Sequence, residues 1–424
     1  MRRATTRLRT LALALMASTV MTAAATAETI TIWSGFPEMV PFYERVAASL
    51  QEEMPDLEVN VEAIALREHE KRIALALTSG AGGPKVIELA GSTAQRYIEN
   101  DLLPPLPDEL ATFVSENFGP FFIQSASADG TLYGVPIFRG QGALFYNIDM
   151  FEDAGLTEPP ATMAEYTDYA NKLTQRDGDG KPTVSGWSLR LSGGGQGIAE
   201  KFWINLHQFG GSLLEQTEDG KWRAGYANEA GRNALKQYLD AVHTDNVVSV
   251  EMPADAEAFQ RGQTAMFIRE SWVIGDTAAK APDLNYATAP LPEGSIALAV
   301  NLYSSDADSD ATWAFMREAN KPEHLIWMLE NVGWLPNLSG VDYSEVTDKI
   351  PQFGAFVNYP EGYEFFTLPA IGPIEEILTR AAAQLTNAFG DADLAGDDAA
   401  IDAYLAAAAE ETNRILEREG LLAQ

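Results

Sequence analysis

The segment from residue 28 to residue 100 alternates between strand-like and helix-like patterns, and this order constrains the fold more than any other feature. Apolar and polar residues alternate over 29–33 and 57–63, and a short apolar run covers 85–89. Each is followed by a segment with helical spacing, so helices are expected at 40–54, 67–79 and 92–100. This β-α-β-α-β-α order predicts a parallel sheet with helices on both faces, where ligands bind at the carboxyl ends of the strands.

The same alternation continues along the rest of the chain. Further strands are expected at 132–138, 143–147, 265–268, 285–289 and 295–303, with Gly140 and Gly142 separating the first two. Further helices are expected at 162–176, 197–209, 229–242, 254–261, 308–319, 322–331 and 397–417. A single hydrophobic core stops growing at about 250–300 residues. A chain of 424 residues without a visible repeat or long linker is therefore expected to form two lobes and to cross between them several times.

Residues 1–27 have the composition of a secretory signal peptide. Basic residues without any acid are followed by an apolar stretch from Leu11 to about Ala25, and Ala25-Thr26-Ala27 has the small-x-small pattern of a cleavage site. A transmembrane anchor is the alternative, but the stretch is short and rich in alanine for a bilayer span. We therefore expect cleavage after Ala27 and a soluble mature protein.

The composition excludes several classes of function. The chain has no cysteine, which excludes disulfides, thiolate metal sites, a cysteine nucleophile and a lipid-modified N-terminal cysteine. It has 61 acidic and 29 basic residues and a formal charge of −32. Removal of residues 1–27, which hold four arginines and no acid, makes the charge more negative still, at −36. Such an excess disfavours binding to nucleic acids or anionic membranes. An exported protein without a lipid tether fits a periplasm.

Several short segments, taken in their order along the chain, resemble a known family. They include Thr31-Ile-Trp-Ser-Gly35, Asp129-Gly-Thr-Leu-Tyr-Gly-Val-Pro136, Leu144-Phe-Tyr-Asn147, Met150-Phe-Glu-Asp-Ala-Gly-Leu156, Ala258-Phe-Gln-Arg-Gly262 and Pro290-Leu-Pro-Glu-Gly294. Together they resemble the bacterial extracellular solute-binding proteins of the sugar-binding class (family 1). These are the receptors of ABC importers and are similar in architecture to maltose-binding-type proteins.

The resemblance implies an α/β, two-lobed periplasmic-binding-protein fold. Each lobe would be a mostly parallel sheet flanked by helices, with the ligand cleft between the lobes. The chain would cross between lobes near 137–142, 287–291 and 334–337. The N-terminal lobe would hold residues 28–138 and 290–334, and the C-terminal lobe residues 139–289 and 335–424. Two departures concern the ligand: Lys85 stands where members often have an acid, and Ile296-Ala297 replace a common glycine pair.

Aromatic side chains that can stack on sugar rings are the first candidates for the ligand site. Trp33, Trp272 and Trp334 match aromatic positions of the family's cleft, and Phe36 and Tyr303 are further candidates. Trp33 and Trp272 lie where a strand or a helix meets a loop, and Trp334 lies in an expected crossing. The alternative interpretation for each is ordinary packing in the core.

Five polar side chains complete the predicted site. Glu38 and Ser92 follow strand ends, where they can bond sugar hydroxyls, with a helix cap or a surface acid as the alternative. Arg139 and Gln141 lie in the first expected crossing, where Arg139 would hold an anionic group or a sugar, or pair with an acid. Gln196 ends a glycine-rich stretch before a helix, which is either a ligand-binding helix start or a surface turn.

The predicted function is that of a monomeric binding protein without a cofactor, metal or catalytic site. The four histidines are scattered, and Asp177-Gly-Asp-Gly-Lys181 departs from a calcium loop at Lys181 and Ser188, so it predicts a turn. The protein would capture a mono- or oligosaccharide by lobe closure and deliver it to the permease subunits of an ABC importer. An anionic sugar or polyol derivative, favoured by Arg139 and Lys85, is the alternative ligand. A secreted glycoside hydrolase is the alternative function.

Overall fold

The computed structural model describes residues 28–79, 83–191, 196–248, 253, 255–307, 309–358 and 363–424. The predicted signal peptide, residues 1–27, lies outside these residues. So does 192–195, most of the glycine-rich stretch before Gln196.

One mixed sheet of eleven strands forms the centre of the molecule. Its strands are β1 (Thr29–Ser34), β2 (Glu58–Ala63), β3 (Val86–Ala90), β6 (Gly134–Asn147), β7 (Gln175–Arg176), β8 (Pro182–Ser188), β11 (Thr264–Glu270), β12 (Tyr286–Ala289), β13 (Ser295–Ser304), β14 (Leu335–Pro336) and β15 (Phe365–Phe366). They follow the order β2-β1-β3-β13-β6-β11-β8-β7, with β12 and β14 paired to β6 and β15 paired to β13. Two further pairs join β4 (Ser127–Ala128) to β5 (Thr131–Leu132) and β9 (Leu214–Gln216) to β10 (Trp222–Ala224).

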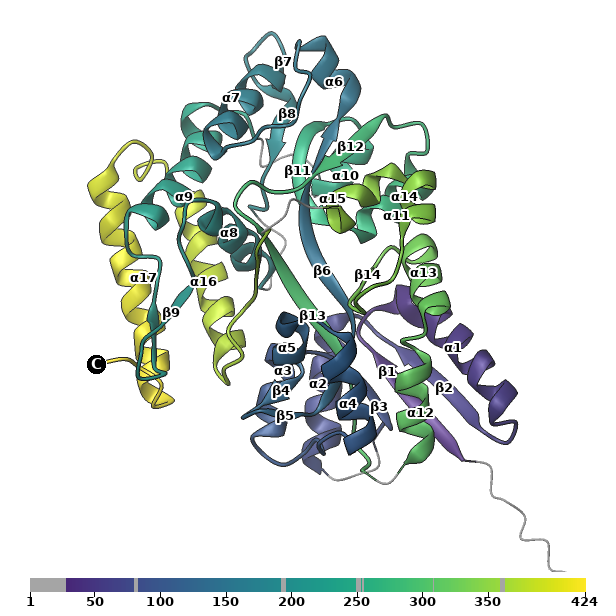
Figure 1. The fold of residues 1–424 in the computed structure, drawn as a ribbon. Coiled ribbons are helices and arrows are strands. Elements are labelled where there is room, and N and C mark those ends of the chain that lie inside the picture. Colours follow the sequence, from purple (N-terminus) through teal and green to yellow (C-terminus); the bar gives the residue numbers. More distant parts are fainter. Residues whose placement is uncertain are drawn as a thin grey trace, which may run out of the picture.

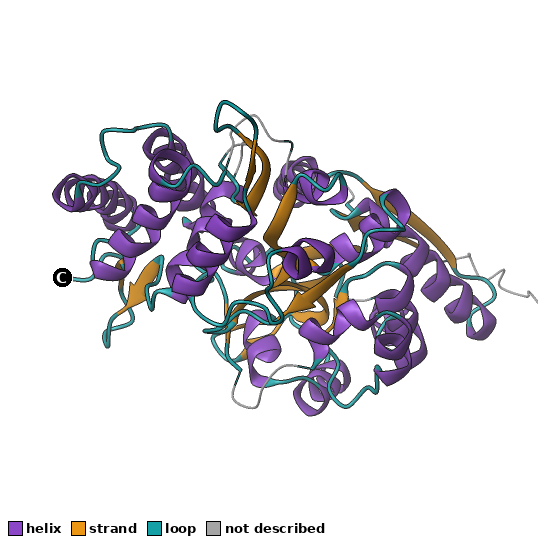
Figure 2. Cartoon of the chain, turned by 90° about the horizontal axis from the view of Figure 1, so that it is seen from above, coloured by secondary structure: helices purple, strands orange, loops and turns teal. Residues whose placement is uncertain are grey.

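Helices surround the strands when the molecule is seen from above (Figure 2). The first group is α1 (Val40–Glu53), α2 (Leu66–Ser79), α3 (Gly91–Ile98), α4 (Asp108–Asn117), α5 (Pro120–Ser125), α12 (Asp310–Glu318) and α13 (Pro322–Asn331). The second group is α6 (Ile148–Asp153), α7 (Met163–Leu173), α8 (Gly197–Gln208), α9 (Glu229–Leu239), α10 (Asp255–Gln260), α11 (Trp272–Lys280), α14 (Ser344–Lys349), α15 (Gly354–Val357), α16 (Ile374–Phe389) and α17 (Asp398–Arg418). The short turns η1 (Pro37–Met39), η2 (Asp240–Thr244, a π-helix) and η3 (Pro351–Phe353) complete the set.

The two groups of helices form two lobes that share the long strands β6 and β13 (Figure 1). In the first lobe β1 pairs in parallel with β2 and with β3, as the β-α-β-α-β-α order predicts. In the second lobe β8 and β11 are parallel as well. The strands β6 and β13 are antiparallel to each other and to their other main neighbours, β11 and β3. The predicted α/β class is therefore confirmed, with an antiparallel pair at the centre of the sheet.

Buried apolar side chains form separate cores in the two lobes. One core of the first lobe contains Ile32, Phe42 and Phe315, which are fully buried. The largest core of the second lobe contains Trp187 and Leu235, which are at most 2% exposed. The exact lobe boundaries given above stay a prediction.

One expectation about local structure was wrong, and several elements were not expected. The strands expected at 132–138 and 143–147 form one continuous strand, β6. The reason is that β13, β14, β11 and β12 pair with β6 along its length, so Gly140 and Gly142 stay within the sheet. In addition, α16 was not among the expected helices, although it contributes to the core of the second lobe.

Candidate ligand-binding cleft

A cleft lies between the two lobes, where α2, β3 and α3 face α8 and α16. Its volume is about 540 Å³, including the space at its open mouth. Its apolar lining residues are Phe36, Leu66, Leu89, Ala90, Leu298, Val300, Leu368, Ile374 and Leu378. Its polar lining residues are Arg67, Glu70, Glu88, Ser92, Thr93, Gln196, Glu200 and Glu375.

The carboxyl ends of three parallel strands place the first wall of the cleft. Phe36 follows β1, Arg67 lies in the first turn of α2 after β2, and Ser92 lies in the first turn of α3 after β3. Parallel strands end at the same edge of a sheet, so these three side chains line the same cleft although they are far apart in sequence. The cleft thus lies at the edge of the sheet where the βα order predicts a ligand.

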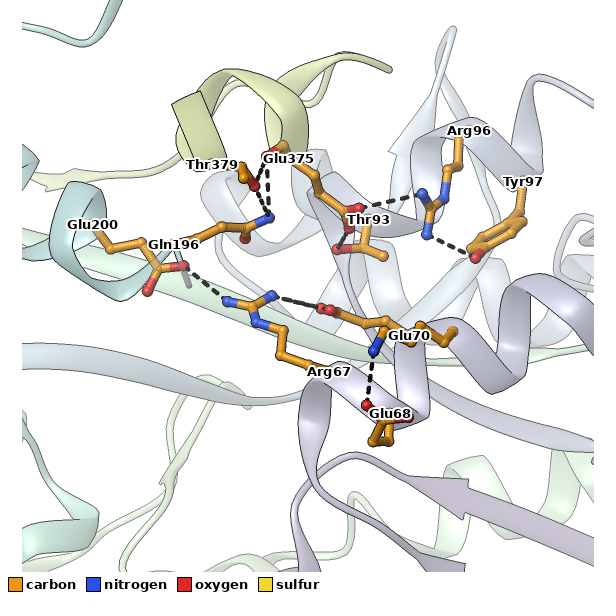
Figure 3. A network of polar contacts seen from close by, with 11 residues as sticks. Arg67, Glu68, Glu70, Thr93, Arg96, Tyr97, Gln196, Glu200, Glu375 and Thr379 are labelled. Carbon is orange, nitrogen blue, oxygen red and sulfur yellow. Dashed lines mark hydrogen bonds and ion pairs between the residues drawn. The ribbon is translucent and has the colours of Figure 1, made fainter. Parts of the chain in front are cut away.

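Ion pairs and hydrogen bonds cross the cleft from one lobe to the other (Figure 3). The Arg67 guanidinium lies 3.0 Å from a carboxylate oxygen of Glu70 on its own helix and 3.5 Å from one of Glu200 on α8. Glu375 on α16 accepts hydrogen bonds from Thr93 and Arg96 of α3, both at 3.3 Å. These contacts hold the two walls together.

Gln196 belongs to the second wall. Its Nε2 donates to the backbone oxygen of Glu375 at 3.1 Å and to the Thr379 hydroxyl at 3.4 Å. It therefore connects the start of α8 to α16, next to the carboxylate that α3 binds (Figure 3).

Glu88 lies at the base of the cleft and is only 1% exposed. Its carboxylate accepts hydrogen bonds from the Ser34 hydroxyl at 2.8 Å, from the Gly35 amide at 3.0 Å and from the Tyr43 hydroxyl. Burial raises the pKa of Glu88 to about 7 against the opposite effect of these three donors. The carboxyl group thus fixes the turn that carries Phe36.

Three aromatic rings pack beside the cleft, near the point where β6 and β14 meet. Phe36 makes edge contacts with Phe138 and Trp334, each with ring centroids 5.2 Å apart. The Trp334 Nε1 donates to Glu38 at 3.1 Å. A Cβ at Gly140 would touch the side chains of Trp334 and Glu270, so Gly140 faces this cluster.

Several predicted site residues therefore lie together. Phe36, Ser92 and Gln196 line the cleft. Glu38 and Trp334 contact each other, and Trp334 packs on Phe36. Trp272 begins α11 beside this cluster, because its backbone lies next to Gly333 and the Ser271 hydroxyl donates to the Gly333 oxygen at 2.6 Å.

The other predicted site residues lie elsewhere. Trp33 and Tyr303 belong to a core cluster of the first lobe, and the Arg72 guanidinium covers the Trp33 ring at 3.5 Å. Side chains alternate along a strand, so Arg139 and Gln141 point away from the face that Gly140 presents to Trp334.

On that far face Arg139 is 6% exposed and has several partners. It donates to Gln141 at 2.9 Å, to the Pro336 oxygen at 2.6 Å and to the Phe356 oxygen at 3.2 Å. Lys85, the second cation behind the anionic alternative, stands just before β3, at the opposite end of that strand from the cleft, and pairs with Asp306.

The ion pairs of the cleft were missed by reasoning from the sequence. Arg67 and Glu70 follow the end of β2, so the rule that pointed to Glu38 and Ser92 would also have found them. Glu200 and Glu375 carry no such local signal, because they meet the first wall only through the packing of α8 and α16.

Two further features concern metals and membranes. Among the described residues, no group of three or more His, Asp or Glu side chains is placed to hold a metal ion. At Asp177 the carboxylate accepts the backbone amides of Asp179 and Lys181, which makes a turn. None of the helices described here has the length and apolar character needed to cross a bilayer.

Comparison with known proteins shows the family and the fold. Residues 45–355 match the model of the family described as bacterial extracellular solute-binding protein. A binding protein of Brucella abortus is 20% identical over 374 residues, or 86% of this chain and 89% of that protein. The lactose-binding protein of Rhizobium radiobacter is 24% identical over 284 residues, or 64% of this chain and 62% of that protein.

A solved structure shares the fold over nearly the whole chain. It is an ABC transporter solute-binding protein of Thermotoga lettingae bound to α-D-tagatose, with a TM-score of 0.76 and 22% identity. The alignment covers 92% of this chain and 100% of that protein, which confirms the two-lobed fold. Because the family model spans most of the chain, the protein belongs to the bacterial extracellular solute-binding proteins.

Proposed function

We propose that the protein is the periplasmic substrate-binding component of an ABC importer. It captures a mono- or oligosaccharide by lobe closure and delivers it to the membrane permease subunits. The observation that carries the proposal is the cleft, because polar side chains of both lobes line it in a chain of the solute-binding family. A ligand that bonds to both walls binds the closed form more tightly than the open form, and this difference drives closure.

The lining of the cleft supports a carbohydrate. Phe36 and the leucines provide apolar surface for the C–H faces of a sugar, and Ser92, Thr93 and Gln196 provide hydroxyl and amide groups for its hydroxyls. The proteins compared above include a lactose-binding protein and a tagatose-bound receptor. Catalysis is not required for this function, and the family is one of binding proteins.

The proposed cellular location of the protein rests on its N-terminal segment. A signal peptide cleaved after Ala27, without a cysteine to carry a lipid, would release a monomer free in the periplasm. In the proposed closure, the N-terminal lobe would close on the C-terminal lobe. The first lobe would hold residues 28–138 and 290–334, and the second residues 139–289 and 335–424.

A screen of sugars by thermal shift, followed by titration calorimetry, tests the proposal. A ligand present at 100 times its Kd is expected to stabilise the folded protein by about 2.7 kcal/mol. If no mono- or oligosaccharide shifts the melting temperature, the carbohydrate proposal fails. Release of free sugar from a glycoside by the purified protein would instead support the hydrolase.

A pair of glutamine variants tests the position of the site. Gln196→Ala is expected to weaken binding of a sugar found in the screen by about fivefold, since it removes one hydrogen-bonding group from the cleft. Gln216→Ala, on the exposed hairpin of β9, is the matched control and should bind like the unchanged protein. Equal affinity in the two variants would place the sugar outside the cleft.

A further inference from the structure

The charged side chains of the cleft are not balanced. Among the described residues that line it, Glu70, Glu88, Glu200 and Glu375 are acidic and Arg67 is basic. Arg96 approaches from the rim and pairs with Glu375. The remaining guanidinium, that of Arg67, is shared by Glu70 on its own helix and Glu200 on the opposite wall.

The shared arginine leaves this part of the cleft one positive charge short. Two carboxylates, Glu70 and Glu200, have one guanidinium between them. The Glu70 side chain is 14% exposed and that of Glu200 27%, so solvent screens both charges only in part. Burial raises the pKa of Glu70 against the opposite effect of Arg67.

Glu88 lies beneath this pair as a further, buried carboxyl group. It is held by Ser34, Gly35 and Tyr43, which are neutral donors. No cation pairs with its carboxylate among the described contacts. A positive group that entered the cleft would therefore meet carboxyl groups on the base and on both walls.

The apolar part of the lining leaves room for the body of such a ligand. Phe36, Leu298 and Val300 line the cleft together with Leu368 and Leu378. An aromatic ring tolerates a nearby cation and stacks on a sugar face. The cleft thus combines a surface for a ring with an excess of carboxylates for one charge.

We propose that the cleft selects a carbohydrate that carries a positively charged group, such as an amino sugar, over the neutral and acidic sugars of the same skeleton. This inference rests on the proposed function and names the class of ligand within it. The ammonium group would bind between Glu70 and Glu200, beside Arg67. An acidic sugar would face the same carboxylates and be repelled by them.

Calorimetric titration with matched sugars tests the inference. The probes are glucose, glucosamine and glucuronate, and galactose, galactosamine and galacturonate, at a pH below the pKa of the amines. In at least one series the amino sugar is expected to bind about tenfold more tightly than the neutral sugar, and the acid more weakly than both.

Two variants on one helix locate the effect. Glu70→Gln keeps the shape of the side chain and removes its charge, so the preference for the amino sugar should fall several-fold. Glu68→Gln is the matched control, because Glu68 is 66% exposed, pairs with Lys71 and does not line the cleft. This control should keep the full preference.

The outcomes separate this inference from the proposed function. If a neutral sugar binds as tightly as its amino counterpart, or an acidic sugar binds more tightly than both, the inference is overturned and the proposed function stands. If neither these probes nor any sugar of the wider screen binds, the proposed function fails as well. A preference that survives in Glu70→Gln would also overturn the assignment to this carboxylate.

Discussion

Burial of a single carboxyl group at the base of the cleft makes the stability of the protein depend on pH. Glu88 is enclosed by β1, α1 and the turn before Phe36, and its pKa rises from the ordinary 4.5 to about 7. Between these two values the folded protein keeps a proton that the unfolded chain has lost. The free energy of unfolding therefore falls as the pH rises through this interval. The full rise in the pKa of Glu88 corresponds to a loss of about 3 kcal/mol at most in the free energy of unfolding.

Glu88→Gln is expected to remove this dependence. A glutamine is neutral at every pH and can occupy the same hydrogen-bonded position, so the variant should be more stable than the unchanged protein above pH 7. The difference should shrink toward pH 4.5, where Glu88 is itself protonated. Thermal unfolding across this range measures it. Glu116→Gln, which is exposed on α4, is the control. A difference between Glu88→Gln and the unchanged protein that does not vary with pH would contradict the prediction.

Arg139 shows how the neighbourhood of a residue decides its role. The sequence places it in a glycine-containing crossing, and a guanidinium there suits an anionic ligand. The structure places it within a continuous strand, on the face away from Trp334, where it donates to the backbone oxygens of Pro336 and Phe356. It joins β6 to β14 and α15. Of the partners of Arg139, only Gln141 is close to it in the chain. Pro336 and Phe356 are distant, so the sequence could not show these contacts.

At the scale of the elements, local pattern predicted the βα order and missed features that depend on pairing. The first three strands and helices lie close to their predicted positions, because each has its own periodicity. The unbroken β6 was missed because its continuity depends on four neighbouring strands. By contrast, α16 was predictable, since Ile374, Ile377, Leu378, Ala381 and Leu385 recur at helical spacing and are all buried.

The junction of β3 and α3 depends on the close approach of another helix. A Cβ at Gly91 would lie 2.1 Å from the backbone oxygen of Ser125 at the end of α5, a distance that forces the two helices apart. The same oxygen accepts a hydrogen bond from Asn301 at 3.0 Å. Ser92 and Thr93 follow Gly91 directly, so the position of this wall of the cleft depends on a residue without a side chain.

Gly91→Ala is expected to destabilise the protein by about 1–3 kcal/mol and to weaken sugar binding by displacing the first turn of α3. The matched control is Gly140→Ala, because a Cβ at Gly140 would meet the Trp334 ring at 3.5 Å, an ordinary contact. Thermal unfolding and calorimetry measure the two effects. Equal melting temperatures for Gly91→Ala and Gly140→Ala would show that α5 yields more easily than the backbone contact implies.

At the scale of the whole molecule, two ion pairs link the lobes across the cleft. Arg67 pairs with Glu200, and Arg96 pairs with Glu375. The side chains of these four residues are 27–43% exposed, so each pair contributes about 1 kcal/mol or less and is screened by salt. In a chain with a formal charge of −32, such pairs offset part of the repulsion between the lobes.

The double variant Arg67→Gln/Arg96→Gln is therefore expected to be more open than the unchanged protein when no sugar is present. Small-angle X-ray scattering at low ionic strength should give it a larger radius of gyration. This difference should disappear in high salt, where the ion pairs of the unchanged protein are screened as well. Arg223→Gln is the control, because its partner Glu215 lies in the same β9–β10 hairpin. Equal radii at low ionic strength would mean that packing of the lobes, rather than these two arginines, sets the closure of the sugar-free protein.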